Sequence, residues 1–172
     1  PGFVNVPYDD LDAVKAATNT ETCAVMVEVL QGEGGVNVPT EGYLKGLREW
    51  CDANGILLIF DEIQTGMGRL GTLWGHQAFD VEPDVMTLAK GLGNGMPVGA
   101  FLCKDRCDIL EPGDHGSTFG GNALATAAAN AKGASAKARA VADQAAGINF
   151  QTLRIWNHIL TATARPSFAL RG

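Results

Sequence analysis

The chain has 172 residues, a formal net charge of −6 and 46% hydrophobic residues, values that are ordinary for a globular protein large enough to bury a sizeable core. No stretch is long and apolar enough to span a bilayer and no charged-then-apolar leader opens the sequence, so we expect a soluble, cytoplasmic protein with no membrane partner. The four cysteines lack a paired CxxC spacing, which favours reduced thiols over disulfides or zinc.

Helical patterns appear early in the chain and again near its middle. The first predicts a short helix over Asp10–Ala17. A second helix is expected to have Thr40 as its N-cap and to run to about Ala53, because apolar side chains recur at helical spacing and Gly55 follows as a C-terminal signal. A further helix is expected to begin at Asn122.

Apolar stretches between these helices predict β-strands. They are Cys23–Leu30, Ile56–Phe60, Val85–Ala89 and Val98–Cys103. The unbroken apolar run of Ile56–Phe60 is typical of a strand buried on both faces, as in a parallel sheet covered by helices. The alternation of strands and helices favours an α/β fold with a parallel sheet.

An acid follows the Ile56–Phe60 strand directly. Asp61 is therefore expected at the carboxyl end of a strand, the edge at which open α/β sheets bind ligands. An acid at that edge is well placed to meet a bound cation. The alternative is that Asp61 serves only as a helix N-cap or turn residue.

Lys90 stands between the Val85–Ala89 strand and the glycine-rich run Gly91–Gly95. A lysine nucleophile works as the free amine in a partly desolvated pocket, and neighbouring glycines let a bulky cofactor approach the backbone. The alternative is a solvated loop lysine. A dinucleotide-binding site is disfavoured, because the spacing of these glycines differs from the Rossmann fingerprint.

These residues belong to four motifs, which are Val27–Gly35, Ile56–Gly66, Thr87–Gly95 and Gly113–Asn122. In order and spacing the motifs resemble the pyridoxal-phosphate site of the fold-type I, class III aminotransferases, over about residues 1–130. The resemblance implies that the chain is the central part of the family's large domain, an α/β unit with a mainly parallel sheet flanked by helices.

The resemblance also implies roles for single residues. Lys90 matches the catalytic lysine that binds the aldehyde of pyridoxal 5'-phosphate. Asp61 matches the acid that pairs with the pyridinium nitrogen, where a carboxylate raises the pKa of the ring nitrogen and helps the ring accept electrons. Gln64 matches the side chain near the ring hydroxyl, and Ile63 the aliphatic residue on one ring face.

Three other positions match residues outside the ring contacts. Ser117 and Thr118 match the segment that reaches across a homodimer interface to the phosphate of the cofactor in the other subunit. Glu33 matches a switch glutamate, which pairs with an arginine for one substrate and releases it for a dicarboxylate. The alternative for Glu33 is a solvated turn acid between glycines.

The substrates implied are small amino acids and 2-oxo acids. Within the family, the sequences of these motifs most resemble those of the members that convert N-acetylornithine and 2-oxoglutarate to N-acetylglutamate 5-semialdehyde and glutamate in arginine biosynthesis. Ornithine or 4-aminobutyrate as amino donor remains open, as does a truncated fragment that only binds. The family's stacking aromatic, one phosphate loop and its carboxylate-binding arginine have no match here, so we expect the isolated chain to be inactive.

Charge changes sign near residue 130. Residues 1–130 carry 7 Lys and Arg against 18 Asp and Glu, whereas residues 131–172 carry 6 against 1, so the net charges are −11 and +5. We therefore divide the chain into 1–130, part of the cofactor domain, and 131–172, an Ala/Arg-rich tail without visible resemblance. A frameshifted or disordered tail is favoured over one that binds nucleic acid, because no aromatic interleaving or nucleic-acid motif is present.

Overall fold

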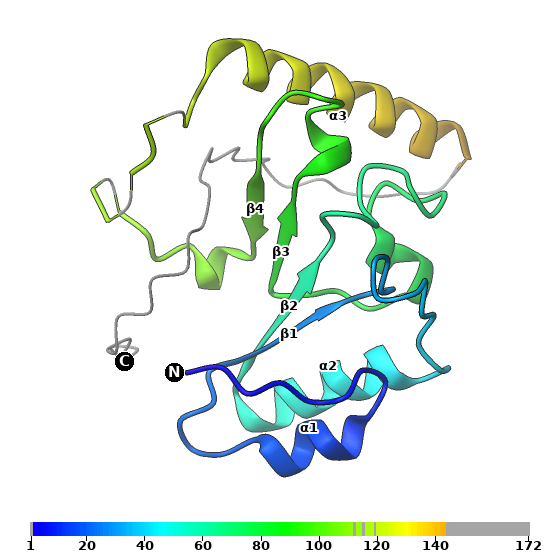
Figure 1. Cartoon of the computed structure of the whole chain (residues 1–172), viewed down its shortest axis with the longest axis vertical. Helices are drawn as coiled ribbons and strands as arrows, with labels where there is room; N and C mark the ends of the chain where they lie inside the picture. The colour runs from blue at the N-terminus through cyan, green and yellow to red at the C-terminus, as the bar shows by residue number, and fades with distance from the viewer. Residues whose placement is uncertain (1, 112, 115, 119, 144–172) are drawn as a thin grey trace.

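The computed structural model describes residues 2–111, 113–114, 116–118 and 120–143, with side chains described as far as Gly133. Within these residues the centre of the fold is a four-stranded sheet in the order β1-β2-β3-β4 (Figure 1). The strands are β1 (Ala24–Glu28), β2 (Leu57–Asp61), β3 (Val85–Leu88) and β4 (Ala100–Cys103). Because β1, β2 and β3 are parallel, the expected mainly parallel α/β sheet is confirmed.

β4 departs from the parallel arrangement and runs antiparallel to β3. The intervening residues 89–99 hold only the 3₁₀ turn η2 (Lys90–Leu92). A parallel return needs a crossover of about a dozen residues or more, usually with a helix, so this short connection returns as an antiparallel neighbour. The longer connection from β2 to β3 does cross over, although it contains only the 3₁₀ helix η1 (Gly75–Phe79).

Helices α1 (Leu11–Ala17) and α2 (Tyr43–Asn54) lie side by side next to β1 and β2 (Figure 1). Asp10 caps α1 by accepting a 2.8 Å hydrogen bond from the Ala13 amide. The prediction that Thr40 caps α2 is wrong: its amide and hydroxyl both donate to Asp9 Oδ1, and Gly42, at φ 88°, stands at the cap without a side-chain bond. Gly55 ends α2 in the left-handed conformation, as predicted.

Helix α3 (Ala123–Asp143) packs against η2 and lies apart from α1 and α2 (Figure 1). Asn122 Oδ1 accepts hydrogen bonds from the amides of Leu124 and Ala125 and so caps its first turn. The helix continues past residue 130 to Asp143, and residues 144–172 of the expected tail lie outside the described residues. No described helix has the length and hydropathy needed to cross a bilayer.

The core is built on one face of the sheet. Leu58 and Phe60 of β2 and Leu47 of α2 are fully buried and belong to one hydrophobic cluster. The alternate side chains Leu57 and Ile59 are only half-buried. Burial of β2 on both faces, which its apolar run predicts, is therefore incomplete in the described chain.

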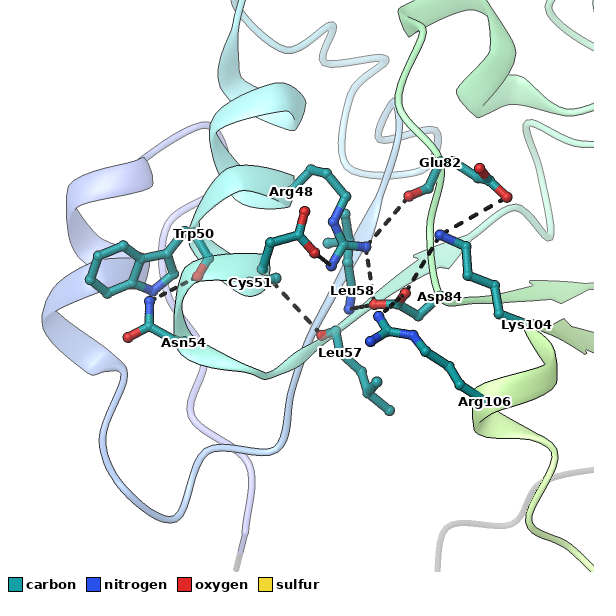
Figure 2. Close-up of polar contacts among 11 residues, drawn as sticks. Arg48, Trp50, Cys51, Asn54, Leu57, Leu58, Glu82, Asp84, Lys104 and Arg106 are labelled. Carbon is teal, nitrogen blue, oxygen red and sulfur yellow. Dashed lines mark hydrogen bonds and ion pairs between the residues drawn. The ribbon is translucent and has the colours of Figure 1, made fainter. Parts of the chain in front are cut away.

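Asp84, directly before β3, joins four segments at the amino ends of the parallel strands (Figure 2). Its carboxylate is fully buried and accepts hydrogen bonds from the Leu58 amide (2.9 Å), Arg48 of α2 (3.0 Å) and Arg106 (2.5 Å), while Lys104 Nζ lies 3.7 Å away. Burial alone raises the pKa of Asp84, but the hydrogen bonds from Arg106, Leu58 and Arg48 outweigh it and lower this pKa to about 2.

Candidate active site

Polar side chains form a row at the opposite edge of the sheet. Strand register pairs Glu28 with Asp61 and Asp61 with Thr87, so these residues lie next to one another at the carboxyl ends of β1, β2 and β3. Partners in neighbouring strands point to the same face, which here is the half-buried one. Ligands of open α/β sheets bind beyond this edge, so the row is the candidate site.

Asp61 stands at the end of β2, where the apolar run predicted it. Its Oδ1 accepts a 2.9 Å hydrogen bond from the Ile63 amide, which is the turn role weighed above. Among the described residues its Oδ2 accepts no hydrogen bond. The half-buried carboxylate therefore stabilises the turn with one oxygen and leaves the other available to a ligand.

Lys90 follows β3 and begins η2 in the left-handed backbone conformation, with φ 40°. Its side chain is 51% exposed, and its Nζ lies 3.6 Å from Glu33 Oε1. A left-handed non-glycine residue costs roughly 1–2 kcal/mol, and such strain concentrates at functional sites. Because the amine is half exposed, the described residues alone do not form the desolvated pocket that a lysine nucleophile needs.

The Gly32–Gly35 loop brings two predicted residues together. The Gly32 amide donates a 3.2 Å hydrogen bond to Glu28 Oε2, which fixes the loop to the end of β1. A Cβ on Gly32 would lie 1.2 Å from Gln64 Oε1, so the Gln64 side chain occupies the space that this glycine leaves open. Gln64 and Glu33 thus lie on the same side of the sheet edge as Asp61 and Lys90.

Ser117 and Thr118 are not brought to this edge by any described contact. Ser117 Oγ accepts a 3.0 Å hydrogen bond from the Gly120 amide, and Thr118 is exposed. No hydrogen bond or ion pair between described residues joins either side chain to Lys90, Asp61 or Gln64. Their contact with a partner subunit stays a prediction.

The structure adds residues that sequence reasoning did not single out. Thr87 Oγ1 is buried and has no hydrogen-bond partner within the described chain, although it lies in register with Asp61. Glu62 and His76 form a buried pair, with Glu62 Oε1 2.7 Å from His76 Nδ1. Glu62 follows Asp61 in the sequence, and this second acid after an apolar strand was the only available signal.

Known proteins match most of this chain. A family model described as aminotransferase class-III matches residues 5–154. An acetylornithine aminotransferase of Methanopyrus kandleri is 55% identical over 129 residues, covering 74% of this chain and 33% of the relative. The acetylornithine aminotransferase of Thermosynechococcus vestitus is 52% identical over 135 residues, covering 75% and 33%. The chain spans about a third of the length of these curated relatives.

Solved structures give the same result. An ornithine aminotransferase from Toxoplasma gondii, whose description mentions partial occupancy of PLP at its active site, matches with a TM-score of 0.75 and 44% identity, covering 83% of this chain and 34% of that one. An acetylornithine aminotransferase from Elizabethkingia anophelis matches with a TM-score of 0.72 and 40% identity, covering 83% and 37%. With its family model matched over residues 5–154, the chain belongs to the class-III aminotransferases.

Proposed function

We propose that the chain is the central part of the cofactor domain of a pyridoxal-phosphate-dependent enzyme that transfers the amino group of N-acetylornithine to 2-oxoglutarate. The observation that carries the proposal is the grouping of an amine, a carboxylate and an amide, from Lys90, Asp61 and Gln64, at one carboxyl edge of the sheet. Relatives of 52–55% identity that are acetylornithine aminotransferases support the choice of amino donor.

The residues present fit pyridoxal phosphate chemically. The cofactor has an aldehyde for an amine, a ring nitrogen for a carboxylate and a ring hydroxyl for an amide. Lys90, Asp61 and Gln64 match these three groups. Asp61 Oδ2, which accepts no hydrogen bond among the described residues, would accept one from the protonated ring nitrogen. Thr87 Oγ1 is buried and has no hydrogen-bond partner among the described residues, so it is available to bind a polar group of a ligand at this edge.

When bound, the cofactor supplies a carbonyl that condenses with amines and a ring that accepts electrons from the amino-bearing carbon. Lys90 Nζ would hold the cofactor through its aldehyde, and its amine would serve as the group that moves the proton at the amino-bearing carbon of the substrate. Asp61 would hold the proton at the ring nitrogen. Gln64 would donate to the ring hydroxyl, and Ile63 would pack on the ring face. Glu33 would pair with an arginine when the amino donor is bound and release that arginine when the dicarboxylate substrate binds.

The proposal also covers the assembly of two subunits into a homodimer and the extent of the cofactor domain in this chain. Ser117 and Thr118 would donate hydrogen bonds to the phosphate in the partner subunit of a homodimer, through their hydroxyl and backbone groups. The exposure of Thr118 agrees with such a role. The cofactor domain would comprise residues 1–130 and the continuation of α3 to Asp143, since the helix crosses the expected boundary without a break and the family model matches residues 5–154.

The direct test is covalent capture of Lys90. The purified chain is incubated with pyridoxal phosphate, reduced with borohydride and mapped by peptide mass spectrometry. We expect the label on Lys90 and its loss in Lys90→Ala. A label found mainly on Lys45 or Lys104 would contradict the proposal.

Ornithine is the second candidate donor, because ornithine aminotransferases from Toxoplasma gondii and Plasmodium falciparum match this fold with TM-scores of 0.75. The two donors are distinguished in the full-length parent enzyme by comparing kcat/KM for N-acetylornithine and ornithine with 2-oxoglutarate. For the isolated chain we expect cofactor capture without turnover, because misplacement of a reacting group by about 1 Å already costs about a hundred-fold in rate. Glutamate formation by the chain that disappears in Lys90→Ala would contradict that expectation.

A further inference from the structure

Glu62 is buried beside the candidate site and has no role in the chemistry above. Its carboxylate is fully buried and receives three hydrogen bonds from the start of η1: from the Gly75 amide at 2.5 Å, and from the His76 amide and Nδ1 at 2.7 Å each. Its own amide donates to the Thr87 carbonyl at 3.0 Å. Glu62 therefore ties η1 to the carboxyl ends of β2 and β3.

The segment Thr65–Met67 is packed into the space next to this carboxylate. The Gly66 amide donates to the Glu62 carbonyl at 3.0 Å, and a Cβ on Gly66 would lie 3.0 Å from Leu88 Cδ2 and 3.3 Å from Glu62 Oε2. On the other side, a Cβ on Gly75 would lie 2.8 Å from Thr65 Cβ. The segment is thus wedged between η1 and Leu88, the last residue of β3.

The same segment also touches the chain beyond Lys90. Met67 is buried in the core, and a Cβ on Gly91 would lie 3.4 Å from Met67 Cβ. Gly66 therefore lies close to the Leu88 side chain, two residues before Lys90, and Met67 lies about one methyl group away from Gly91, one residue after it. The segment Thr65–Met67 therefore lies beside the chain both before and after Lys90.

We propose that Glu62 is a positioning residue for Lys90, acting through Thr65–Met67 with His76 as its partner. The proposal rests on the role proposed for Lys90. A left-handed backbone, such as that of Lys90 with φ 40°, persists only where its surroundings hold it. The half-exposed Lys90 side chain makes few contacts that could hold this backbone conformation, so the buried segment Thr65–Met67 has to hold it.

The geometry requires a carboxylate at position 62. Three N–H donors converge on two oxygens, whereas the glutamine of Glu62→Gln would turn an NH₂ group toward one of them. His76→Leu removes one donor, and His76→Asn offers a side-chain N–H in its place. Glu49→Gln, at an exposed acid of α2, is the matched control for the loss of one negative charge.

The first measurement needs no cofactor. The Leu92 amide donates to the Ala89 carbonyl at 2.8 Å and closes the Lys90 turn, so its hydrogen exchange reports whether the turn is held. We expect Glu62→Gln and His76→Leu to speed this exchange by about tenfold or more, because a hydrogen bond to a charged group is lost. His76→Asn and Glu49→Gln should leave it unchanged.

Two results would overturn the proposal. In one, exchange at Leu92 is unchanged while the Gly75 and His76 amides exchange faster, so that Glu62 serves η1 alone. In the other, β2 amides accelerate by the same factor as Leu92, so that the variant only loses global stability. If Glu62→Gln does not fold, the exchange rates of the Leu92 amide in His76→Leu and His76→Asn are compared instead. Faster exchange in His76→Leu alone supports the proposal, and equal rates in the two variants overturn it.

The second measurement uses pyridoxal phosphate capture. The ratio of borohydride-fixed label on Lys90 to that on Lys104 should fall about tenfold in Glu62→Gln and stay unchanged in His76→Asn, because the turn presents the amine only when it is held. An unchanged ratio in Glu62→Gln counts against positioning. If the parent chain is not labelled at Lys90, the proposed function fails, whereas Leu92 exchange still decides the role of Glu62.

Discussion

The two ends of one sheet carry acids with opposite surroundings. At the amino ends of the parallel strands, Asp84 is fully buried, accepts three hydrogen bonds and has its pKa lowered to about 2 (Figure 2). At the carboxyl ends, Asp61 uses one oxygen in a turn, and Lys90 is half exposed with a left-handed backbone. At the first end the buried Asp84 carboxylate has its hydrogen bonds within the chain, although Arg48 Nε has no partner among the described residues. At the second end Asp61 Oδ2 and Thr87 Oγ1 have no hydrogen-bond partner among the described residues and are available to a ligand.

This difference indicates where stability and chemistry lie. A buried polar group with all its partners holds segments together, as Asp84 holds α2, β2 and β3. A group without partners adds little to folding but can bind something else. Substitutions at the two ends should therefore separate activity from stability.

Lys90→Gly is expected to have the largest effect on chemistry and almost none on folding. It removes the only amine proposed to bind cofactor, so covalent capture should disappear. Glycine adopts φ 40° without strain, and the free energy of unfolding should stay equal or rise by about 1 kcal/mol. Urea unfolding measures it, and a loss of more than about 1 kcal/mol would show that the Lys90 side chain stabilises the fold.

Asp61→Asn in the full-length parent enzyme should retain the turn but lose most of the rate. The amide oxygen still accepts the hydrogen bond from the Ile63 amide, whereas the charge proposed to face the ring nitrogen is gone. Breaking a buried charge pair costs about 3–5 kcal/mol, which as a barrier is roughly a hundred- to several-thousand-fold in kcat. Asp80→Asn, at an exposed acid, is the control, and an Asp61→Asn enzyme within a few-fold of the parent would reduce Asp61 to a turn residue.

Asp84→Ala should have the reverse effect, lowering stability while Lys90 remains available for capture where the chain is folded. It leaves Arg48, whose side chain is 15% exposed, without its buried partner, and we expect a loss of about 3–5 kcal/mol. Asp52 is the matched control, because it binds the same Arg48 at 2.7 Å but is 60% exposed, so Asp52→Ala should cost under about 1 kcal/mol. Equal losses in urea unfolding would contradict the comparison.

The sequence predicted the carboxyl end of the sheet better than the amino end. An acid directly after an apolar strand and a lysine before glycines are local signals, so Asp61 and Lys90 were visible from the printed chain. The Asp84 cluster was not, because Arg48 and Arg106 reach it from positions far apart in sequence. Glu62 was hidden for the same reason, since its partners lie 13 and 14 residues away. The prediction for Thr40 was wrong because its hydroxyl donates to Asp9, which lies before α1 and far away in the sequence.

Acid should unfold the chain partly through Asp84. Its pKa is about 2 in the folded state and 3.8 unfolded, so the stabilisation is complete above about pH 4 and is lost as pH falls toward 2. The shift corresponds to about 2 kcal/mol. In urea titrations across this window, Asp84→Asn should show a shallower loss of stability than the parent. Parallel pH profiles for both proteins would mean that other carboxylates account for the acid sensitivity.

Lys104 is expected to contribute least, although it belongs to the same cluster. Its Nζ is 3.7 Å from Asp84 and 4.0 Å from Glu82, and its side chain is 36% exposed, so water and salt screen the attraction. Lys104→Met keeps the aliphatic stem and the backbone bond from its amide to the Asp84 carbonyl, and should cost under about 1 kcal/mol. Arg106→Met removes the 2.5 Å hydrogen bond and should cost more. Equal losses for the two in urea unfolding would show that net positive charge, and not hydrogen bonding, stabilises the buried carboxylate.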